Sequence, residues 1–334
     1  MSTAPEERVL TYRQALNEAL HEEMDRDARV IVMGEDIAAA GGVYKVTAGL
    51  LEAYGPERVL DTPISEAGIA GVALGASMTG LRPVVEIMFG DFLFLAADQL
   101  LNQAAKVRYM SGGKLGAPMV VRTMLGAGRR AAAQHSQSVH AMFAHIPGVK
   151  VILPSDPADA KGLLKSAIRD PDPVIFFEDK LSYGITGPVP TAETLIPIGR
   201  AAVKRHGSDV TLIASSRAVA DAMSSAQELA SEGIEAEVVD LRTLTPLDSE
   251  MVLSSVRKTG RCVVIDQGHR RFGAAAEIVA LIMEDAFDCL KVGVSRVAAL
   301  DVPAPYSPAL EDLTLPGQER IVEAARALFR RTKE

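Results

Sequence analysis

The sequence predicts an α/β protein made of two wound domains, and three observations lead to that prediction. Short apolar runs alternate with longer segments that have the periodicity of amphipathic helices. A stretch rich in proline and glycine, residues 183–199, interrupts this alternation. The alternation then resumes, and a chain of 334 residues has the length of about two ordinary domains.

The first series contains apolar runs that we interpret as buried parallel strands. These runs are residues 30–33, 84–88, 119–122, 149–153 and 173–178. Residues 12–26 and 158–169 have helical periodicity, and this order favours a sheet with right-handed crossovers. We place the first domain at residues 1–185 and a linker at residues 186–200.

The second series has the same organisation, which places a second wound domain at residues 201–334. Its expected strands are residues 210–214, 235–240, 262–266 and 292–297. Its expected helices are residues 217–232, 274–285 and 320–331.

Composition excludes several classes of protein. A net charge of −8 argues against a nucleic-acid partner, because phosphate backbones are bound by basic surfaces. No apolar stretch approaches the roughly 18 residues of a membrane span, and the first residues do not form a secretory signal. Two cysteines provide neither a disulfide framework nor a metal cluster. We therefore expect a cytoplasmic protein with no membrane partner.

The sequence has no motif that holds a nucleotide or a diphosphate. Neither G-x-G-x-x-G nor the P-loop pattern occurs. The G-D-G motif that begins the metal and diphosphate site of thiamine enzymes is also missing, since Gly90-Asp91 is followed by Phe92.

Glu66 is a lone carboxylate at the start of an apolar helix. Ser65 is a suitable N-cap, and the helix that follows is rich in glycine and alanine. Glycines in a helix each cost about 1 kcal/mol, so they indicate close approach of another element or a ligand. Glu66 is either a first-turn residue favoured by the helix dipole or a functional carboxylate, and its local sequence leaves both interpretations open.

Phe92 and His135 are two further candidates. Phe92 and Phe94 begin an expected helix in which Phe94 belongs to the core and Phe92 is able to pack on a flat ring. His135 precedes Ser136, the expected N-cap of a helix that stops at residues 147–148, a position that favours neutral imidazole. The alternative is a solvated loop histidine. His140 and His145 follow at intervals of five residues and share no helical face, which argues against zinc.

Six ordered motifs resemble one known family. They are D-T-P-I-S-E-A-G at 61–68, R-Y-M-S-G-G at 108–113, A-A-Q-H-S-Q-S at 132–138, I-P-G-V-K-V at 146–151, D-A-K-G-L-L at 159–164 and I-R-D-P-D-P-V-I-F-F-E at 168–178. From about Leu10 onward the chain resembles the β subunits of the decarboxylating component of 2-oxo acid dehydrogenase complexes. The acetoin dehydrogenase branch looks most similar, with pyruvate and branched-chain types as near neighbours.

The resemblance implies an oxidoreductase that uses thiamine diphosphate. It implies a transketolase-like pyrimidine-binding domain, a transketolase C-terminal-like domain and an α2β2 heterotetramer whose α subunit holds Mg²⁺ and the diphosphate. Glu66 matches the glutamate that exchanges a proton with the aminopyrimidine, while Met88 and Phe92 match residues that line that ring. His135 matches the histidine that transfers protons as the acyl group moves to a lipoyl arm.

The resemblance further implies a potassium site and several partners. The matching potassium positions are Met119, Ala167, Ile168, Asp170 and Asp172, mostly through main-chain oxygens. The partners are the α subunit, a dihydrolipoyl acyltransferase core with its lipoyl domain, and a small substrate, either acetoin or a 2-oxo acid. Two alternatives remain: a single-chain transketolase-type enzyme, which the missing diphosphate motif disfavours, and a non-catalytic α/β scaffold.

Overall fold

The computed structural model describes residues 7–330, which divide into two compact units. The first unit comprises residues 7–125 and Phe143–Ile198, and the second comprises Gly126–Met142 and residues 199–330. The segment Gly126–Met142, which contains His135, therefore belongs to the second unit although it lies within the stretch 1–185 that we assigned to the first domain.

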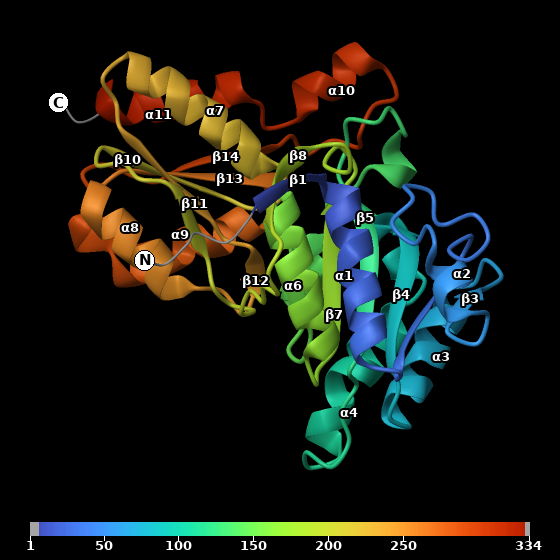
Figure 1. The fold of residues 1–334 in the computed structure, drawn as a ribbon. Coiled ribbons are helices and arrows are strands. Elements are labelled where there is room, and N and C mark those ends of the chain that lie inside the picture. The colour runs from blue at the N-terminus through green and yellow to red at the C-terminus, as the bar shows by residue number, and fades with distance from the viewer. Residues whose placement is uncertain (1–6, 331–334) are drawn as a thin grey trace, which may run out of the picture. The chain divides into compact units, whose positions relative to one another are not determined.

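The first unit is built on a parallel sheet with the strand order β6-β7-β5-β4-β2-β3. Its strands are β2 (Val30–Gly34), β3 (Val59–Asp61), β4 (Arg82–Phe89), β5 (Val120–Leu125), β6 (Lys150–Ile152) and β7 (Val174–Asp179). Helices α1 (Tyr12–Arg26) and α6 (Pro157–Arg169) lie side by side over this sheet, as Figure 1 shows. Their apolar sides and Val30, Val84 and Phe176 share one buried cluster. The predicted parallel strands of this half are confirmed.

A small antiparallel pair, β1 (Glu7–Thr11) and β8 (Thr186–Pro190), also belongs to the first unit. Strand β8 lies within residues 186–200, which we expected to be a linker. Its sequence Thr-Gly-Pro-Val-Pro contains two prolines, which sheets tolerate only at edges, so the segment has the composition of a loop.

The chain after β4 is helical but irregular. A 3₁₀ turn (Gly90–Phe94) leads into a π-helical segment (Asp98–Ala104) and then α4 (Ala105–Met110). The expectation that Phe94 belongs to the core is wrong, because its side chain is 42% exposed. A 3₁₀ turn and a π turn rotate side chains differently from an α-helix, so α-helical periodicity does not predict which residues are buried here.

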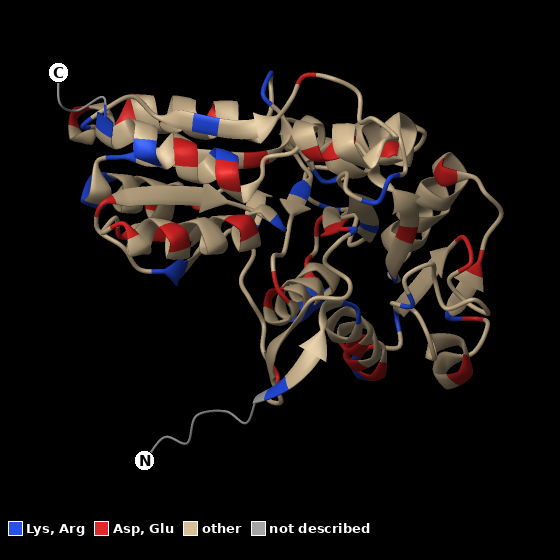
Figure 2. Ribbon diagram, turned by 90° about the horizontal axis from the view of Figure 1, so that it is seen from above, with Lys and Arg blue, Asp and Glu red and all other residues tan. Residues whose placement is uncertain are grey.

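The second unit is a three-layer α/β structure with the strand order β14-β13-β10-β11-β9. Its strands are β9 (Ala202–Arg205), β10 (Val210–Ala214), β11 (Ala236–Asp240), β13 (Cys262–His269) and β14 (Ser295–Ala299); only β9 is antiparallel. Helices α7 (Ala218–Ser231) and α11 (Gln318–Arg330) cover one face, and α8 (Ser249–Thr259) and α9 (Ala274–Asp285) cover the other. Charged residues lie mainly on these helices and on loops, while the strands carry few (Figure 2).

Strand β14 begins at Ser295, three residues later than predicted. Among residues 7–330, no helix combines the length and the apolar character needed to cross a membrane.

Candidate functional site

The first group of candidates lies at the carboxyl edge of the first unit's sheet. Glu66 is the first residue of α3 (Glu66–Met78), which follows β3, while Met88 lies near the end of β4 and Phe92 in the turn after it. Because β3, β2 and β4 are parallel neighbours, their carboxyl ends meet at one edge. The fold therefore places all three residues at the edge where α/β sheets bind ligands.

Glu66 is partly buried and has no partner of opposite charge. Within residues 7–330 its carboxylate makes no ion pair or hydrogen bond with another side chain. Ser65, the expected N-cap, does precede the helix, but its side chain makes no capping hydrogen bond. A half-buried carboxylate without a partner is costly unless a bound group satisfies it.

Glu35 is a second carboxylate at this edge, and sequence reasoning missed it. It follows β2 directly, and burial, together with the negative charges of Asp36 and Glu66, raises its pKa above the ordinary value. Its position in the sequence could have identified it, because an acidic residue directly after a buried parallel strand lies at the ligand-binding edge of the sheet.

The aromatic residues near the end of β4 contact one another. The rings of Phe89 and Phe92 meet edge to face with centroids 5.5 Å apart, and the Lys180 ammonium lies 4.7 Å from the centre of the Phe89 ring. Met88 is partly buried and packs against the unit's core. Phe92 is therefore oriented by its neighbours rather than free to rotate.

A buried ionic cluster joins the strands β4, β5 and β7. The Arg122 guanidinium donates to both oxygens of Glu178 at 2.7 and 2.9 Å and to Glu86 at 2.8 Å. The Tyr183 hydroxyl also donates to Glu178, at 2.7 Å. Burial raises the pKa of Glu178, although Arg122 opposes that effect. Such fully bonded networks fix the relative positions of the strands that carry them.

His135 lies in a strained segment of the second unit. It ends a single 3₁₀ turn (Ala133–His135), and the nearby residues Arg130 and Ala132 have positive φ of 59° and 61°. Positive φ is costly for residues other than glycine and is concentrated at functional sites. The segment is held by Arg130, which donates to Glu311 at 2.6 Å and to Asp312 at 2.7 Å.

The prediction that Ser136 caps a helix is wrong, since α5 (His140–Ala144) begins four residues later. His140 instead forms a buried pair with Asp266, with Nε2 2.9 Å from Oδ1. Burial alone would raise the pKa of Asp266, but the charge and hydrogen bond of His140 and the N–H groups of Gly268 and Ala275 hold it below the ordinary value. Across residues 7–330 no three His, Cys, Asp or Glu side chains gather in a metal-binding arrangement.

The five candidate potassium ligands lie elsewhere, toward the amino edge of the first unit's sheet. Met119 precedes β5, Ala167 and Ile168 end α6, and Asp170 and Asp172 precede β7. A six-residue strand such as β5 spans roughly 20 Å, so these positions are remote from Glu66.

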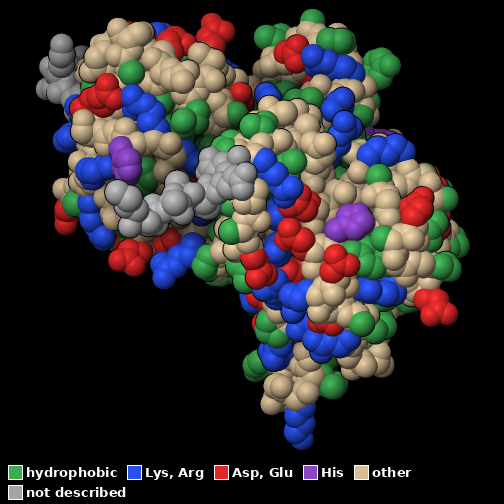
Figure 3. Space-filling model, viewed as in Figure 1, with side chains coloured by type: hydrophobic (Ala, Val, Ile, Leu, Met, Phe, Trp, Pro, Cys, Tyr) green, Lys and Arg blue, Asp and Glu red, His purple; other side chains and the backbone are tan. Residues whose placement is uncertain are grey.

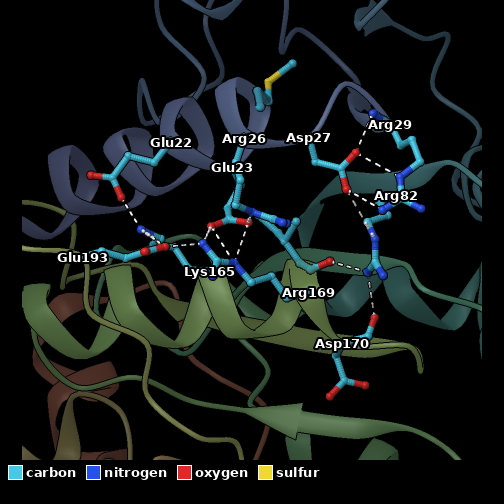
Figure 4. A network of polar contacts seen from close by, with 12 residues as sticks. Glu22, Glu23, Arg26, Asp27, Arg29, Arg82, Lys165, Arg169, Asp170 and Glu193 are labelled. Atoms are coloured by element: carbon cyan, nitrogen blue, oxygen red, sulfur yellow. Dashed lines mark hydrogen bonds and ion pairs between the residues drawn. The ribbon is translucent and has the colours of Figure 1, made fainter.

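Two of those carbonyl oxygens already converge on one cation. Arg82 Nη1 donates to the carbonyl of Ile168 at 2.8 Å and to that of Asp170 at 3.2 Å. Figure 4 shows Arg82 reaching toward Asp170. Each carbonyl keeps a second lone pair, so these oxygens are able to accept from Arg82 and ligate an ion at once.

Two α/β units, the first with a glutamate at its ligand-binding edge that has no partner within residues 7–330, define a protein of the transketolase class. Residues 8–186 match the family described as "Transketolase, pyrimidine binding domain", and residues 199–321 match "Transketolase, C-terminal domain". A solved structure titled "Split gene transketolase, inactive beta4 tetramer" has a TM-score of 0.80 at 24% identity, covering 96% of this chain and 98% of its own, which supports the fold.

Similar proteins of known name show which family within this class the chain belongs to. The acetoin:2,6-dichlorophenolindophenol oxidoreductase subunit beta of Bacillus subtilis is 48% identical, with 96% of this chain and 98% of the relative covered. The pyruvate dehydrogenase E1 component subunit beta of Rhizobium meliloti is 48% identical (96% and 70% covered), and the 2-oxoisovalerate dehydrogenase subunit beta of B. subtilis is 45% identical (96% and 98%). The chain belongs to this family of β subunits of acetoin oxidoreductases and 2-oxo acid dehydrogenases.

Proposed function

We propose that this chain is the β subunit of a thiamine-diphosphate-dependent oxidoreductase. The enzyme would cleave acetoin or a 2-oxo acid, pyruvate or branched-chain, and pass the acyl group to the lipoyl arm of a dihydrolipoyl acyltransferase. The observation that carries the proposal is Glu66, a half-buried carboxylate at the carboxyl edge of the sheet that has no side-chain partner among the described residues 7–330. The family membership of the chain supports the same reaction class.

Glu66 would act as the proton relay of the site. Its carboxyl group would donate a hydrogen bond to N1′ of an aminopyrimidine and pass a proton to that nitrogen. Glu35 adds a second negative charge beside it, which favours a protonated, hydrogen-bonded partner in this pocket. Phe92, held by Phe89, and Met88 would line the ring and exclude water.

Thiamine diphosphate, when bound, would supply a carbon nucleophile and an electron sink. His135 would act as general acid or base during transfer of the acyl group, because an imidazole is able both to accept and to donate a proton. The strained segment that carries it is fixed by Arg130, so the imidazole would be positioned before substrate arrives.

We propose an α2β2 assembly in which an α subunit holds Mg²⁺ and the diphosphate. The sequence lacks a diphosphate motif. Helix α3 exposes a face of small and apolar residues, Gly68, Val72 and Gly75, and α4 exposes Tyr109 (88%) and Met110 (79%). Exposed apolar surface of this kind indicates a protein interface. An assembly of this type would lie in the cytoplasm.

We also propose that the carbonyls of Ala167, Ile168 and Asp170, with Met119 and Asp172, hold K⁺ as a structural ion. The support is that two of these oxygens, the carbonyls of Ile168 and Asp170, lie close enough together to accept from one nitrogen, Arg82 Nη1. The thermal midpoint of the purified chain should then be several degrees higher in KCl than in choline chloride at equal ionic strength. Equal thermal midpoints in the two salts would contradict the proposed potassium site.

The catalytic assignment is tested by Glu66→Gln in the reconstituted α and β subunits. We expect turnover of acetoin, pyruvate or a branched-chain 2-oxo acid with an artificial electron acceptor to fall by roughly 10²-fold or more, with unchanged thermal stability. Glu52→Gln, an exposed residue of the same unit, is the matched control and should leave turnover unchanged. Retention of full activity by Glu66→Gln would contradict the assignment.

A further inference from the structure

The segment that carries His135 is a loop with a strained backbone. The Gly126 N–H donates to the carbonyl of Gln137 at 3.3 Å and brings the two ends of the loop together. Between them, two residues that are not glycine have positive φ of 59° and 61°. Such a backbone persists only where surrounding contacts hold it, so the contacts of this segment determine where His135 lies.

On the amino-terminal side of His135, the segment is bound to Glu311, a fully buried residue of α10 (Pro308–Thr314). The Gly128 N–H donates to Glu311 Oε1 at 3.0 Å. Arg130 Nη1 donates to Glu311 Oε2 at 2.6 Å. Both oxygens of this buried carboxylate therefore bind the segment, one through its backbone and the other through a side chain.

On the carboxyl-terminal side of His135, the segment is bound to Asp266 of β13, which is 5% exposed. His140 Nε2 lies 2.9 Å from Asp266 Oδ1, and two backbone N–H groups of the second unit donate to the same carboxylate. Arg130 lies five residues before His135, and His140 lies five residues after it. The histidine is therefore midway between two anchors, each of which is a buried carboxylate.

Stability alone is a poor reason for two buried carboxylates. A charged group loses its hydration when it is buried, and a buried ion pair often contributes no more to stability than apolar residues of the same size. Such a pair does define a position, because its hydrogen bonds form only within a narrow range of distances and angles. A general acid or base needs a defined position, since a displacement of about 1 Å costs roughly 10²-fold in rate.

We propose that Glu311 and Asp266 are positioning residues for His135, which they hold from both sides in the orientation that acyl transfer requires. Both carboxylates act through the segment that they bind and not by contact with substrate. The inference rests on the proposed role of His135 in transfer to the lipoyl arm. Loss of either anchor slows that transfer and leaves unchanged the steps that do not use the imidazole.

The test compares two reactions of the enzyme reconstituted from α and β subunits: turnover with an artificial electron acceptor, and acyl transfer to a lipoyl domain. In Glu311→Gln the new side chain keeps an oxygen that accepts a hydrogen bond, and Arg130 keeps its pairing with Asp312, so the variant should fold. We expect kcat for transfer to fall roughly tenfold, while KM for the lipoyl domain and turnover with the artificial acceptor stay within about twofold of wild type. Asp266→Asn, assayed well below its unfolding temperature, should have the same effect.

Matched variants separate positioning from a general loss of structure. Glu319→Gln, an exposed residue in the first turn of α11, is the control and should leave both reactions unchanged. Adding Glu311→Gln to His135→Gln should slow transfer no further, because both changes act on the same group. An equal fall in both reactions in Glu311→Gln, or additive losses in the double variant, would overturn the inference.

Hydrogen exchange distinguishes failure of this inference from failure of the proposed role of His135. The amides of residues 132–138 should exchange about tenfold faster in Glu311→Gln and Asp266→Asn than in Glu319→Gln, because release of an anchor favours local opening. Unchanged transfer in His135→Gln would contradict the proposed role of His135 but not the anchoring of its segment. Unchanged exchange in both anchor variants would overturn the inference itself.

Discussion

At the scale of single residues, motif and family resemblance made Glu66, Met88 and Phe92 candidates, and the structure places all three at one edge of a sheet; their roles stay predictions. Local sequence patterns could not predict an interaction whose two residues are far apart along the chain. The sequence correctly provided no reason to make His140 a zinc ligand. Its pairing with Asp266, however, could not be inferred from the local pattern, because the two residues are 126 positions apart. Ser136 was wrongly assigned as an N-cap because serine is a common residue at that position. In the structure it follows a 3₁₀ turn, in a segment that Arg130 ties to Glu311.

The pair of His140 and Asp266 makes a prediction about pH. Asp266→Asn should lower the free energy of unfolding by about 3 kcal/mol at pH 7, because it leaves a buried partner uncompensated. The native pKa of Asp266 is lowered, so the stabilisation is present above the unfolded value near 4 and is lost as pH falls through the native value.

Urea unfolding of both proteins between pH 3 and pH 8 checks this prediction. The difference in free energy of unfolding between wild type and Asp266→Asn should shrink as pH falls below about 5. The exposed Asp285→Asn serves as control and should change stability by less than about 0.5 kcal/mol. A difference that grows as pH falls would contradict the charge pairing.

At the scale of elements, the strands were predictable because buried parallel strands are continuous apolar runs. The contact between α1 and α6 could not be predicted, because the charged residues that form it look in the sequence like residues on the solvent-exposed sides of two helices. Lys161 and Lys165 of α6 are almost fully buried, and both bind Glu22 of α1. Figure 4 shows this network, and Figure 3 shows positive and negative side chains interleaved on that face.

Glu22→Gln should therefore destabilise the first unit. It removes the charge shared by two buried ammonium groups, and we expect a loss of about 1–2 kcal/mol, reduced by the partial exposure of Glu22. Thermal unfolding at low and high salt is the measurement, with Glu52→Gln as control. A loss no larger than that of Glu52→Gln would mean that the network contributes little.

The exposed face of α3 leads to a prediction that separates folding from assembly. A Cβ at Gly75 meets no atom within 4 Å, so Gly75→Ala should stabilise the isolated chain by up to about 1 kcal/mol. If this face packs on a partner, the added methyl group should at the same time weaken association with the α subunit.

Analytical ultracentrifugation of the mixed subunits, beside thermal unfolding of the chain alone, measures both effects. Ser231→Ala, an exposed helix residue of the second unit, should leave association unchanged. Stabilisation without any loss of association would exclude this face from the interface.

At the scale of the whole molecule, the wound α/β class followed from alternation alone. The placement of Gly126–Met142 in the second unit did not follow from the sequence, because Gly128 and Arg130 donate hydrogen bonds to Glu311, which is 183 and 181 residues away along the chain. The missing diphosphate motif is likewise a property of the whole sequence rather than of a residue, and the proposed α subunit would supply that part of the site.

The most direct test of this account is a calorimetric titration of thiamine diphosphate with Mg²⁺ into the purified chain, alone and then mixed with its α subunit. The account predicts no tight binding by this chain alone, stoichiometric binding by the mixture, and loss of that binding in Glu66→Ala. Tight, magnesium-dependent binding by this chain alone would contradict it, because the chain would then hold the diphosphate itself.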